Sequence, residues 1–260
     1  MSNVAGLEGF VEFFRGYGDS FAVLGGAACS QWLGDANLEF RNTKDIDLVV
    51  VLEARDRKFF ERLWRYLHNG GYVKWQRSDG KKVAFRFVEP MTPGYPFMIE
   101  LLSRPDIIEA PRGQKILPVD PGDGLSSLSA ILLDEAYYGL ILENRSVTRS
   151  GLPAVTPDAL LALKAKAHLN LLADKEDGKK VRERDILKHR NDVFHLAYLV
   201  DDSVSVSLPE PIAEDLRRFL GLYPATDSRW EGIMQSLKET HYQPVEPTEL
   251  IGIIRTHFGL

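Results

Sequence analysis

The fold of this chain is decided by two stretches of sequence, Leu24-Gly-Gly-Ala-Ala28 and Arg41-Asn-Thr-Lys-Asp-Ile-Asp-Leu-Val49. The apolar run from Ser20 to Leu24 ends in Gly25-Gly26, which predicts a buried strand that enters a tight turn. Residues 27–33 then predict a short helix, and residues 45–52 predict a second strand. Two strands and a glycine turn with acidic residues beside it therefore form the predicted centre of the fold.

Two carboxylates open the second of these strands. Side chains alternate along a strand, so Asp45 and Asp47 lie on one face while Ile46 lies on the other. Two like charges on adjacent same-side positions repel each other, and a hard cation bound through oxygen resolves that repulsion. An exposed strand end with two solvated aspartates would explain the pair, taken alone, equally well.

Two neighbouring features favour the cation. Gly25 and Gly26 allow close backbone approach, and the helix after them offers free N–H groups to a phosphate. Glu100 interrupts the apolar strand predicted at 97–102, where an acid is unfavourable unless it is paired or bound to metal. The alternative for Glu100 is a half-exposed residue bonded to a nearby arginine or lysine.

The remaining sequence divides into two parts. An α/β part has helices predicted at 6–16 and 54–68, strands at 82–88 and 97–102, a loop-rich segment over 103–128 and a run at 131–143 that leans to strand. A change of composition near 151 is followed by predicted helices at 158–173, 182–200, 210–220, 228–240 and 247–257. We therefore expect an α/β (α+β) protein with a mixed-sheet catalytic domain over 1–152 and a helical domain over 153–260.

Composition excludes several classes. The chain has 260 residues, a formal net charge of −5, 44% hydrophobic and 27% charged residues, which is ordinary for a globular protein and argues against wholesale coating of nucleic acid. Its single cysteine, Cys29, excludes an internal disulfide. Residues 1–18 lack a signal-peptide pattern, and no stretch approaches the ~18 apolar residues of a membrane span. We therefore expect a cytoplasmic protein with no membrane contact.

The two opening stretches resemble the signature of the polymerase-β-like nucleotidyltransferase superfamily. The form with Gly-Gly followed by Arg41-x-Thr43-x-Asp45-Ile-Asp47 is most similar to the AbiEii-type toxin branch. Many superfamily members have serine where this chain has Gly26, and the segment from Gly26 to Asp45 is longer than in the minimal members. The resemblance implies a metal site of two Mg²⁺ or Mn²⁺ ions at Asp45, Asp47 and Glu100, and a nucleotide site at Gly25, Gly26, Arg41 and Thr43.

The second half adds weaker matches to the same branch. Lys164, with Ala167 three residues later, matches a helical motif, and Lys164 falls inside the apolar stripe of its helix at about 100° per residue. Arg190 and Asp192 match a later motif, in which Asn191 and His195 replace a lysine and an aspartate. The helical wheel puts Arg190 on the apolar face and Asp192 on the polar side, where it faces either a cleft between the two domains or solvent. The resemblance implies that Lys164 and Arg190 bind nucleotide and that Lys164 and Asp192 belong to the catalytic group; a lysine that merely extends its charged end to solvent is the alternative for Lys164.

These motifs predict an enzyme that moves a nucleoside monophosphate from a nucleoside triphosphate to an acceptor hydroxyl. The resemblance implies an RNA or tRNA acceptor, with an antitoxin protein as partner of the toxin. A small hydroxyl compound of the antibiotic type is the alternative acceptor, and a catalytically inactive nucleotidyltransferase-fold binding module is the alternative from another class. The charged run 174–188 is either a solvated connection or an RNA phosphate contact, and the histidines show no metal-ligand spacing with Cys29.

Overall fold

The computed structural model describes residues 4–43, 45–50, 57–77, 83–103, 116–118, 131, 134–240 and 245–260. An eight-stranded mixed sheet forms the first part, in the order β6-β3-β4-β5-β2-β1-β8-β7. The strands are β1 (Phe21–Leu24), β2 (Asp45–Val50), β3 (Tyr72–Arg77), β4 (Val83–Pro90), β5 (Met98–Ser103), β6 (Ile116–Pro118), β7 (Arg145–Val147) and β8 (Pro153–Val155). The predicted mixed α/β architecture is confirmed.

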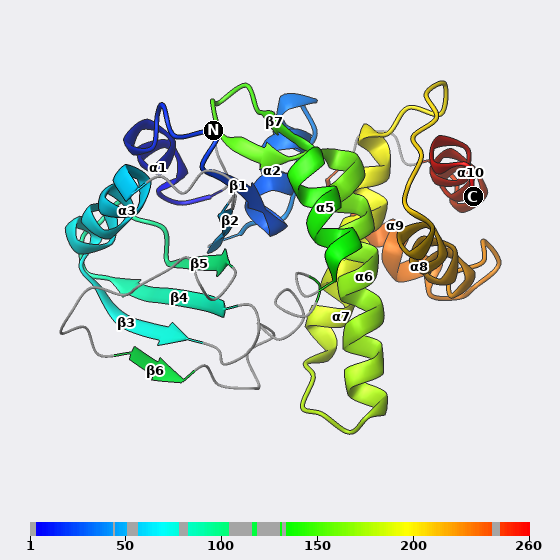
Figure 1. Cartoon of the computed structure of the whole chain (residues 1–260). Coiled ribbons are helices and arrows are strands. Elements are labelled where there is room, and N and C mark those ends of the chain that lie inside the picture. Colours follow the sequence, from blue (N-terminus) through cyan, green and yellow to red (C-terminus); the bar gives the residue numbers. More distant parts are fainter. Residues whose placement is uncertain are drawn as a thin grey trace.

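The first part contains α1 (Leu7–Phe13), α2 (Gly25–Asp35), α3 (Arg57–Gly70) and α5 (Glu135–Glu143). The second part contains α6 (Pro157–Glu176), α7 (Glu183–Leu196), the short 3-10 turn η1 (Ala197–Leu199), α8 (Glu210–Gly221), α9 (Trp230–Lys238) and α10 (Pro247–Phe258). The helices α1 and α3 lie at one side of the sheet, and α5 packs against α6 at the other side (Figure 1). The long α6–α7 hairpin stands between the sheet and the outer helices α8 to α10.

The five helices predicted after residue 156 are confirmed, because their apolar residues recur at helical spacing and their ends carry proline or acidic residues. The sheet, however, runs past residue 152. Strand β8 pairs in parallel with β1 through Val23 and Ala154, and a continuous apolar core joins both parts. The division into domains at 152/153 therefore stays a prediction.

The strand preference predicted for residues 131–143 is wrong. Residues 135–143 form α5, and Asp134 caps it by accepting a hydrogen bond from the backbone N–H of Ala136 at 2.9 Å. The buried residues Tyr137, Tyr138, Leu140 and Ile141 recur at helical spacing, so the branched and aromatic content that suggested a strand serves a buried helix face instead.

Other boundaries shifted. The helix after the first strand begins at Gly25 itself, two residues earlier than expected, and strand β3 was not predicted. Most of the loop predicted over 103–128 lies outside the described residues, apart from Ser103 and β6. Within the described part of the chain, no helix is both long and apolar enough to cross a membrane.

Candidate active site

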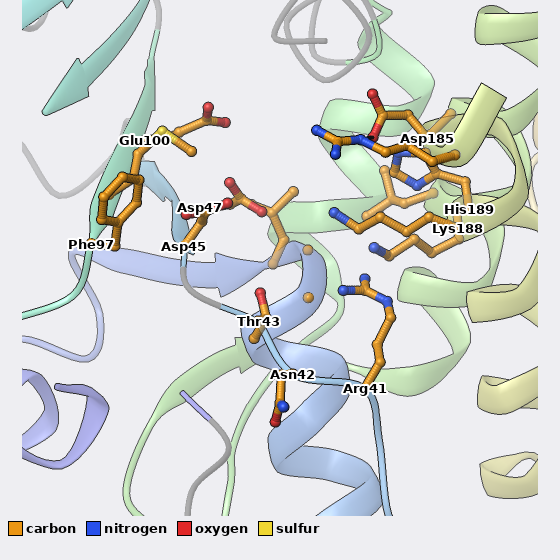
Figure 2. Close-up of a pocket in the computed structure, with 18 of the residues that line it drawn as sticks. Arg41, Asn42, Thr43, Asp45, Asp47, Phe97, Glu100, Asp185, Lys188 and His189 are labelled. Atoms are coloured by element: carbon orange, nitrogen blue, oxygen red, sulfur yellow. Dashed lines mark ion pairs between the residues drawn. The ribbon is translucent and has the colours of Figure 1, made fainter. Parts of the chain in front are cut away.

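A cleft of about 910 Å³ opens between the central strands and the α6–α7 hairpin. The turn from β1 into α2 forms its floor, and the strands β2, β4 and β5 form one wall. Figure 2 shows Asp45, Asp47 and Glu100 on the strand side of this cleft, and Arg41 and Lys188 on the other side, with His189 and the carboxylate of Asp185 beside Lys188. The cleft therefore has a mainly acidic half, in which Arg86 pairs with Glu100, and a mainly cationic half, which also contains Asp185.

The acidic half is built by strand register. Strand β2 runs antiparallel to β1 and parallel to β5, which places Asp47 opposite Leu24 on one side and opposite Glu100 on the other. Asp45 is the first residue of β2, lies opposite Met98 and lines the cleft with Asp47. The two aspartates predicted to share one strand face and the third acid predicted on a later strand therefore line the same cleft.

Glu100 is buried, with 5% of its surface exposed. The guanidinium of Arg86, on the adjoining strand β4, donates to Glu100 Oε1 from Nε at 2.9 Å and approaches the same oxygen through Nη2 at 2.7 Å. Burial and the neighbouring Asp47 carboxylate nevertheless raise the pKa of Glu100 to about 8, against the opposing effect of Arg86. The arginine partner considered as the alternative for this acid is present, but so is the contact with Asp47.

The glycine turn brings the start of α2 against the acids. Gly25 has φ +69°, and a Cβ placed on it would lie 1.8 Å from Asp47 Oδ2, so only glycine fits here. A Cβ on Gly26 would lie 2.8 Å from Thr43 Oγ1. The N-cap residue Leu24 supplies no side-chain bond, and the first N–H groups of α2 therefore remain suited to an anion in the cleft.

A buried network of ion pairs lies behind the cationic half of the cleft. Asp192 on α7 is fully buried; it accepts from Arg41 Nε at 2.8 Å and Nη2 at 2.7 Å, and pairs with Lys164 Nζ at 2.8 Å. Burial opposes ionisation, but Lys164 and Arg41 hold the pKa of Asp192 well below its usual range. The helical wheel left two alternatives for Asp192 on the polar side of α7, a cleft between the two parts or solvent; the structure excludes solvent, because Asp192 is fully buried behind Arg41 and Lys164, which line the cleft.

The cleft residues that the sequence analysis did not assign to the site include Lys188 and His189. Burial and the nearby Arg41 and Lys164 lower the pKa of Lys188, and among the described residues Lys188 has no ion-pair partner. His189 is held neutral, since burial and Lys164 lower its pKa well below the usual value, and its Nδ1 has no hydrogen-bond partner within the described structure. The signal that could have found them is the shared helix face at 185, 188, 189 and 192.

The structure brings together most of the predicted site. Arg190 is not among the residues it brings there: it lies over the ring of Tyr223 at 5.8 Å from the centroid, donates to the Asn191 side chain and does not line the cleft. Asp192 lies behind the cleft wall, with Arg41 and Lys164 in front of it. The predicted residues that line the cleft are Gly25, Gly26, Arg41, Thr43, Asp45, Asp47, Glu100 and Lys164.

The acids alone do not supply all the ligands that a hard cation needs. Among the described residues, no three His, Cys, Asp or Glu side chains are gathered tightly enough to hold an ion alone. Magnesium, however, usually takes one or two carboxylates and completes its octahedron with water and substrate phosphates. Asp45 and Asp47 match that demand, and the contact between the Asp47 and Glu100 carboxylates is the kind that a cation relieves. The donor set therefore suits an ion that arrives with a phosphate ligand.

No protein-family model and no curated protein matches the sequence. One similar solved structure is an antigenic nucleotidyltransferase-like protein from Paracoccidioides brasiliensis, with 14% sequence identity, a TM-score of 0.42, and coverage of 96% of this chain and 91% of that chain. The two backbones superpose too loosely for that protein's description to assign a function here.

Proposed function

We propose that this protein is a metal-dependent nucleotidyltransferase, which moves a nucleoside monophosphate from a nucleoside triphosphate to an acceptor hydroxyl. The observation that carries the proposal is the division of one cleft into an acidic wall and a cationic wall, with a helix start between them. A triphosphate with bound divalent ions has the complementary arrangement, since its ions need carboxylates and its outer phosphates need cations.

The residues would divide the work as follows. Asp45 and Asp47 would hold two Mg²⁺ or Mn²⁺ ions, with Glu100 as third ligand through the oxygen that Arg86 does not bind. When bound, the ions would neutralise charge on the attacking and leaving oxygens. Gly25 and Gly26 let the phosphates approach the α2 backbone, and the chain's own contribution is positioning and charge neutralisation.

Lys188 is proposed as the main phosphate-binding cation. Lys164 and Arg41 share the charge of Asp192 at 2.7–2.8 Å, whereas Lys188 faces the cleft beside these two cations with its pKa lowered by burial and by their charge. A phosphate placed there would relieve that repulsion. The predicted roles of Lys164 and Asp192 then become the support of a cationic wall, and the predicted nucleotide contact of Arg190 would need a movement of α7.

The proposed acceptor is an RNA or tRNA hydroxyl, and the proposed biological role is that of a toxin with an antitoxin protein as partner. Both proposals follow from the AbiEii-type motifs. The chemistry is the same for an RNA acceptor and for a small hydroxyl compound. The hydroxyl oxygen bonds to the α-phosphorus, the bond from that phosphorus to the bridging oxygen breaks, and pyrophosphate leaves with the electron pair. Once ionised, Glu100 is well suited to take the hydroxyl proton, because its pKa is raised to about 8.

Calorimetric binding of a nucleoside triphosphate with a non-cleavable α,β-bridge tests the proposal. Wild-type protein should bind it with Mg²⁺ and at least ~10-fold more weakly with EDTA. Asp45→Asn/Asp47→Asn should remove the metal dependence, because it removes two anionic ligands, while Asp19→Asn, an exposed acid outside the cleft, should bind like the wild type. Equal binding with and without Mg²⁺, or none by the wild type, would contradict the proposal.

A further inference from the structure

His189 is a cleft residue to which the proposed function gives no part. It lies on α7 next to Lys188 and about one turn before Asp192, and it lines the cleft. Figure 2 shows it beside Lys188 and Asp185, on the same side of the cleft as Arg41. Its Nδ1 atom is out of contact with solvent and has no hydrogen-bond partner among the described residues. A buried ring nitrogen without a partner, at the wall of a cleft, indicates a contact that a ligand completes.

The surroundings of His189 carry an excess of positive charge. Lys164, Lys188 and Arg41 are the nearby cations, and Asp192 is the nearby carboxylate. Asp192 is itself bonded to Arg41 and Lys164 at 2.7–2.8 Å, so these cations share one buried negative charge. Burial, and after it the charge of Lys164, lowers the pKa of His189 well below its usual value. Without an anion in the cleft, the ring of His189 is therefore neutral near pH 7.

Other titratable groups approach this part of α7. Asp185 lies one turn before His189 and forms an ion pair with Arg184 at 3.8 Å. Cys29 on α2 is fully buried, and burial raises the pKa of its thiol to about 11, so it is uncharged at neutral pH. His168 on α6 is turned to the α7 backbone, where the carbonyl of residue 186 lies 3.0 Å from its Nδ1. Helix α9 contacts α7 nearer its C-terminal end, through aromatic rings. Asp185 is therefore the other carboxylate that bears on the charge of His189.

A bound polyphosphate reverses the balance of charge around the ring. Each phosphate group brings negative charge and oxygens that accept hydrogen bonds. An anion within ~4–6 Å favours the protonated form of a histidine. The protonated ring donates from both nitrogens, whereas the neutral ring donates from one. A proton therefore turns the bare ring nitrogen into a donor for a phosphate oxygen.

We infer that His189 binds the outer phosphates of the nucleotide and takes up a proton as they enter the cleft. This inference rests on the proposed function and adds to it a phosphate-binding residue whose charge appears only with the ligand. Lys164 and Arg41 hold charges that Asp192 balances. A further permanent cation beside them would be buried without a counter-charge, which is costly. His189 supplies its positive charge only when the anion is present, so the free protein does not carry that cost.

Calorimetry with inorganic tripolyphosphate in EDTA, at pH 6 and in buffers of different ionisation enthalpy, measures the proton uptake. Under these conditions Glu100 keeps its own proton, because its pKa is raised to about 8 and no metal displaces it. Wild-type protein should take up about one proton more than His189→Asn, which keeps a hydrogen-bonding group but does not titrate. The ratio of the wild-type affinity to the variant affinity should fall about 10-fold as pH rises from 6 to 8, because the proton is then harder to acquire.

Two variants and a second measurement serve as controls. His68→Gln replaces an exposed histidine of α3 outside the cleft and should take up the proton like the wild type. Asp185→Asn removes the other carboxylate on this face of α7 and should also keep the uptake. Histidine-ring NMR of the wild type at pH 6 does not depend on the stability of any variant. The His189 resonance should move from its neutral to its protonated position when tripolyphosphate is added.

Equal proton uptake by the wild type and His189→Asn overturns the inference. So does an uptake that is lost in Asp185→Asn but kept in His189→Asn, or a His189 resonance that stays at its neutral position. Absence of tripolyphosphate binding by a wild type that binds nucleotide with Mg²⁺ also overturns it. Failure of the proposed function is seen separately, as loss of Mg²⁺-dependent nucleotide binding by a wild type that still takes up the proton with tripolyphosphate.

Discussion

Asp192→Asn tests the buried network that supports the cationic wall. The substitution keeps the shape of the side chain and removes its charge, which is fully buried and touches Arg41 and Lys164 at 2.7–2.8 Å. Two cations are then left without a counter-charge, and breaking a buried pair in this way destabilises by about 3–5 kcal/mol. That is a large part of the ~5–15 kcal/mol of a typical domain.

Urea unfolding at pH 7 measures the loss. The pKa of Asp192 is lowered from its usual 3.8, so its stabilisation is fully present above that pH and is lost only as the pH falls through the lower folded pKa. Asp177→Asn, at an exposed acid on the tip of the α6–α7 hairpin, should stay within about 0.5 kcal/mol of the wild type. Lys164→Met/Asp192→Asn should destabilise less than the sum of the two single variants. A loss below about 1 kcal/mol for Asp192→Asn would refute the network's importance.

Three other outcomes follow from the cleft. Gly25→Ala should abolish Mg²⁺-dependent nucleotide binding, because its Cβ would lie 1.8 Å from a carboxylate oxygen, whereas Gly34→Ala in the same helix meets nothing within 4 Å and should bind normally; binding by Gly25→Ala would contradict the close approach. Because the pKa of Glu100 is raised, the free energy of unfolding without metal should fall as pH rises from 4.5 to about 8. The affinity for the metal-nucleotide complex should rise over the same range, because the ion displaces a proton from Glu100. An affinity that calorimetry finds constant between about pH 6 and 9 would contradict this. Lys188→Met should weaken triphosphate binding about 10-fold in the same assay, a loss of about 1.4 kcal/mol, while the exposed Lys180→Met should not; equal affinities would exclude the phosphate role.

The sequence predicted the acidic wall well, because its geometry is local. Strand alternation puts Asp45 and Asp47 on one face, and an acid inside an apolar strand marks Glu100 without any knowledge of tertiary structure. The pairing of Glu100 with Arg86 could not be assigned, since strand neighbours depend on the order of strands in the sheet. The sequence predicted that Gly25 allows a close backbone approach. It did not predict that the close neighbour is Asp47, because that contact depends on the register between β1 and β2.

The cationic wall was harder to predict. A helical wheel separates an apolar face from a polar face but does not say what covers the polar one, so it left Asp192 facing either a cleft or solvent, whereas Asp192 is fully buried. Lys188 is one of many charged residues in the segment 174–188, so composition does not separate it from the others. Only the helix face that it shares with Asp192 marks it as a site residue. Arg190 matched a motif by spacing, yet two residues along a helix turn a side chain about 200° away from Asp192.

The most direct test of metal-dependent nucleotidyl transfer compares one nucleoside triphosphate labelled at its α-phosphate with the same compound labelled at its γ-phosphate, each incubated with total RNA and Mg²⁺. The α-label should pass to the acceptor and the γ-label should be released as pyrophosphate, and both events should vanish in Asp45→Asn/Asp47→Asn. Transfer of the γ-label, or α-label transfer that persists with EDTA or in that double variant, would contradict the account.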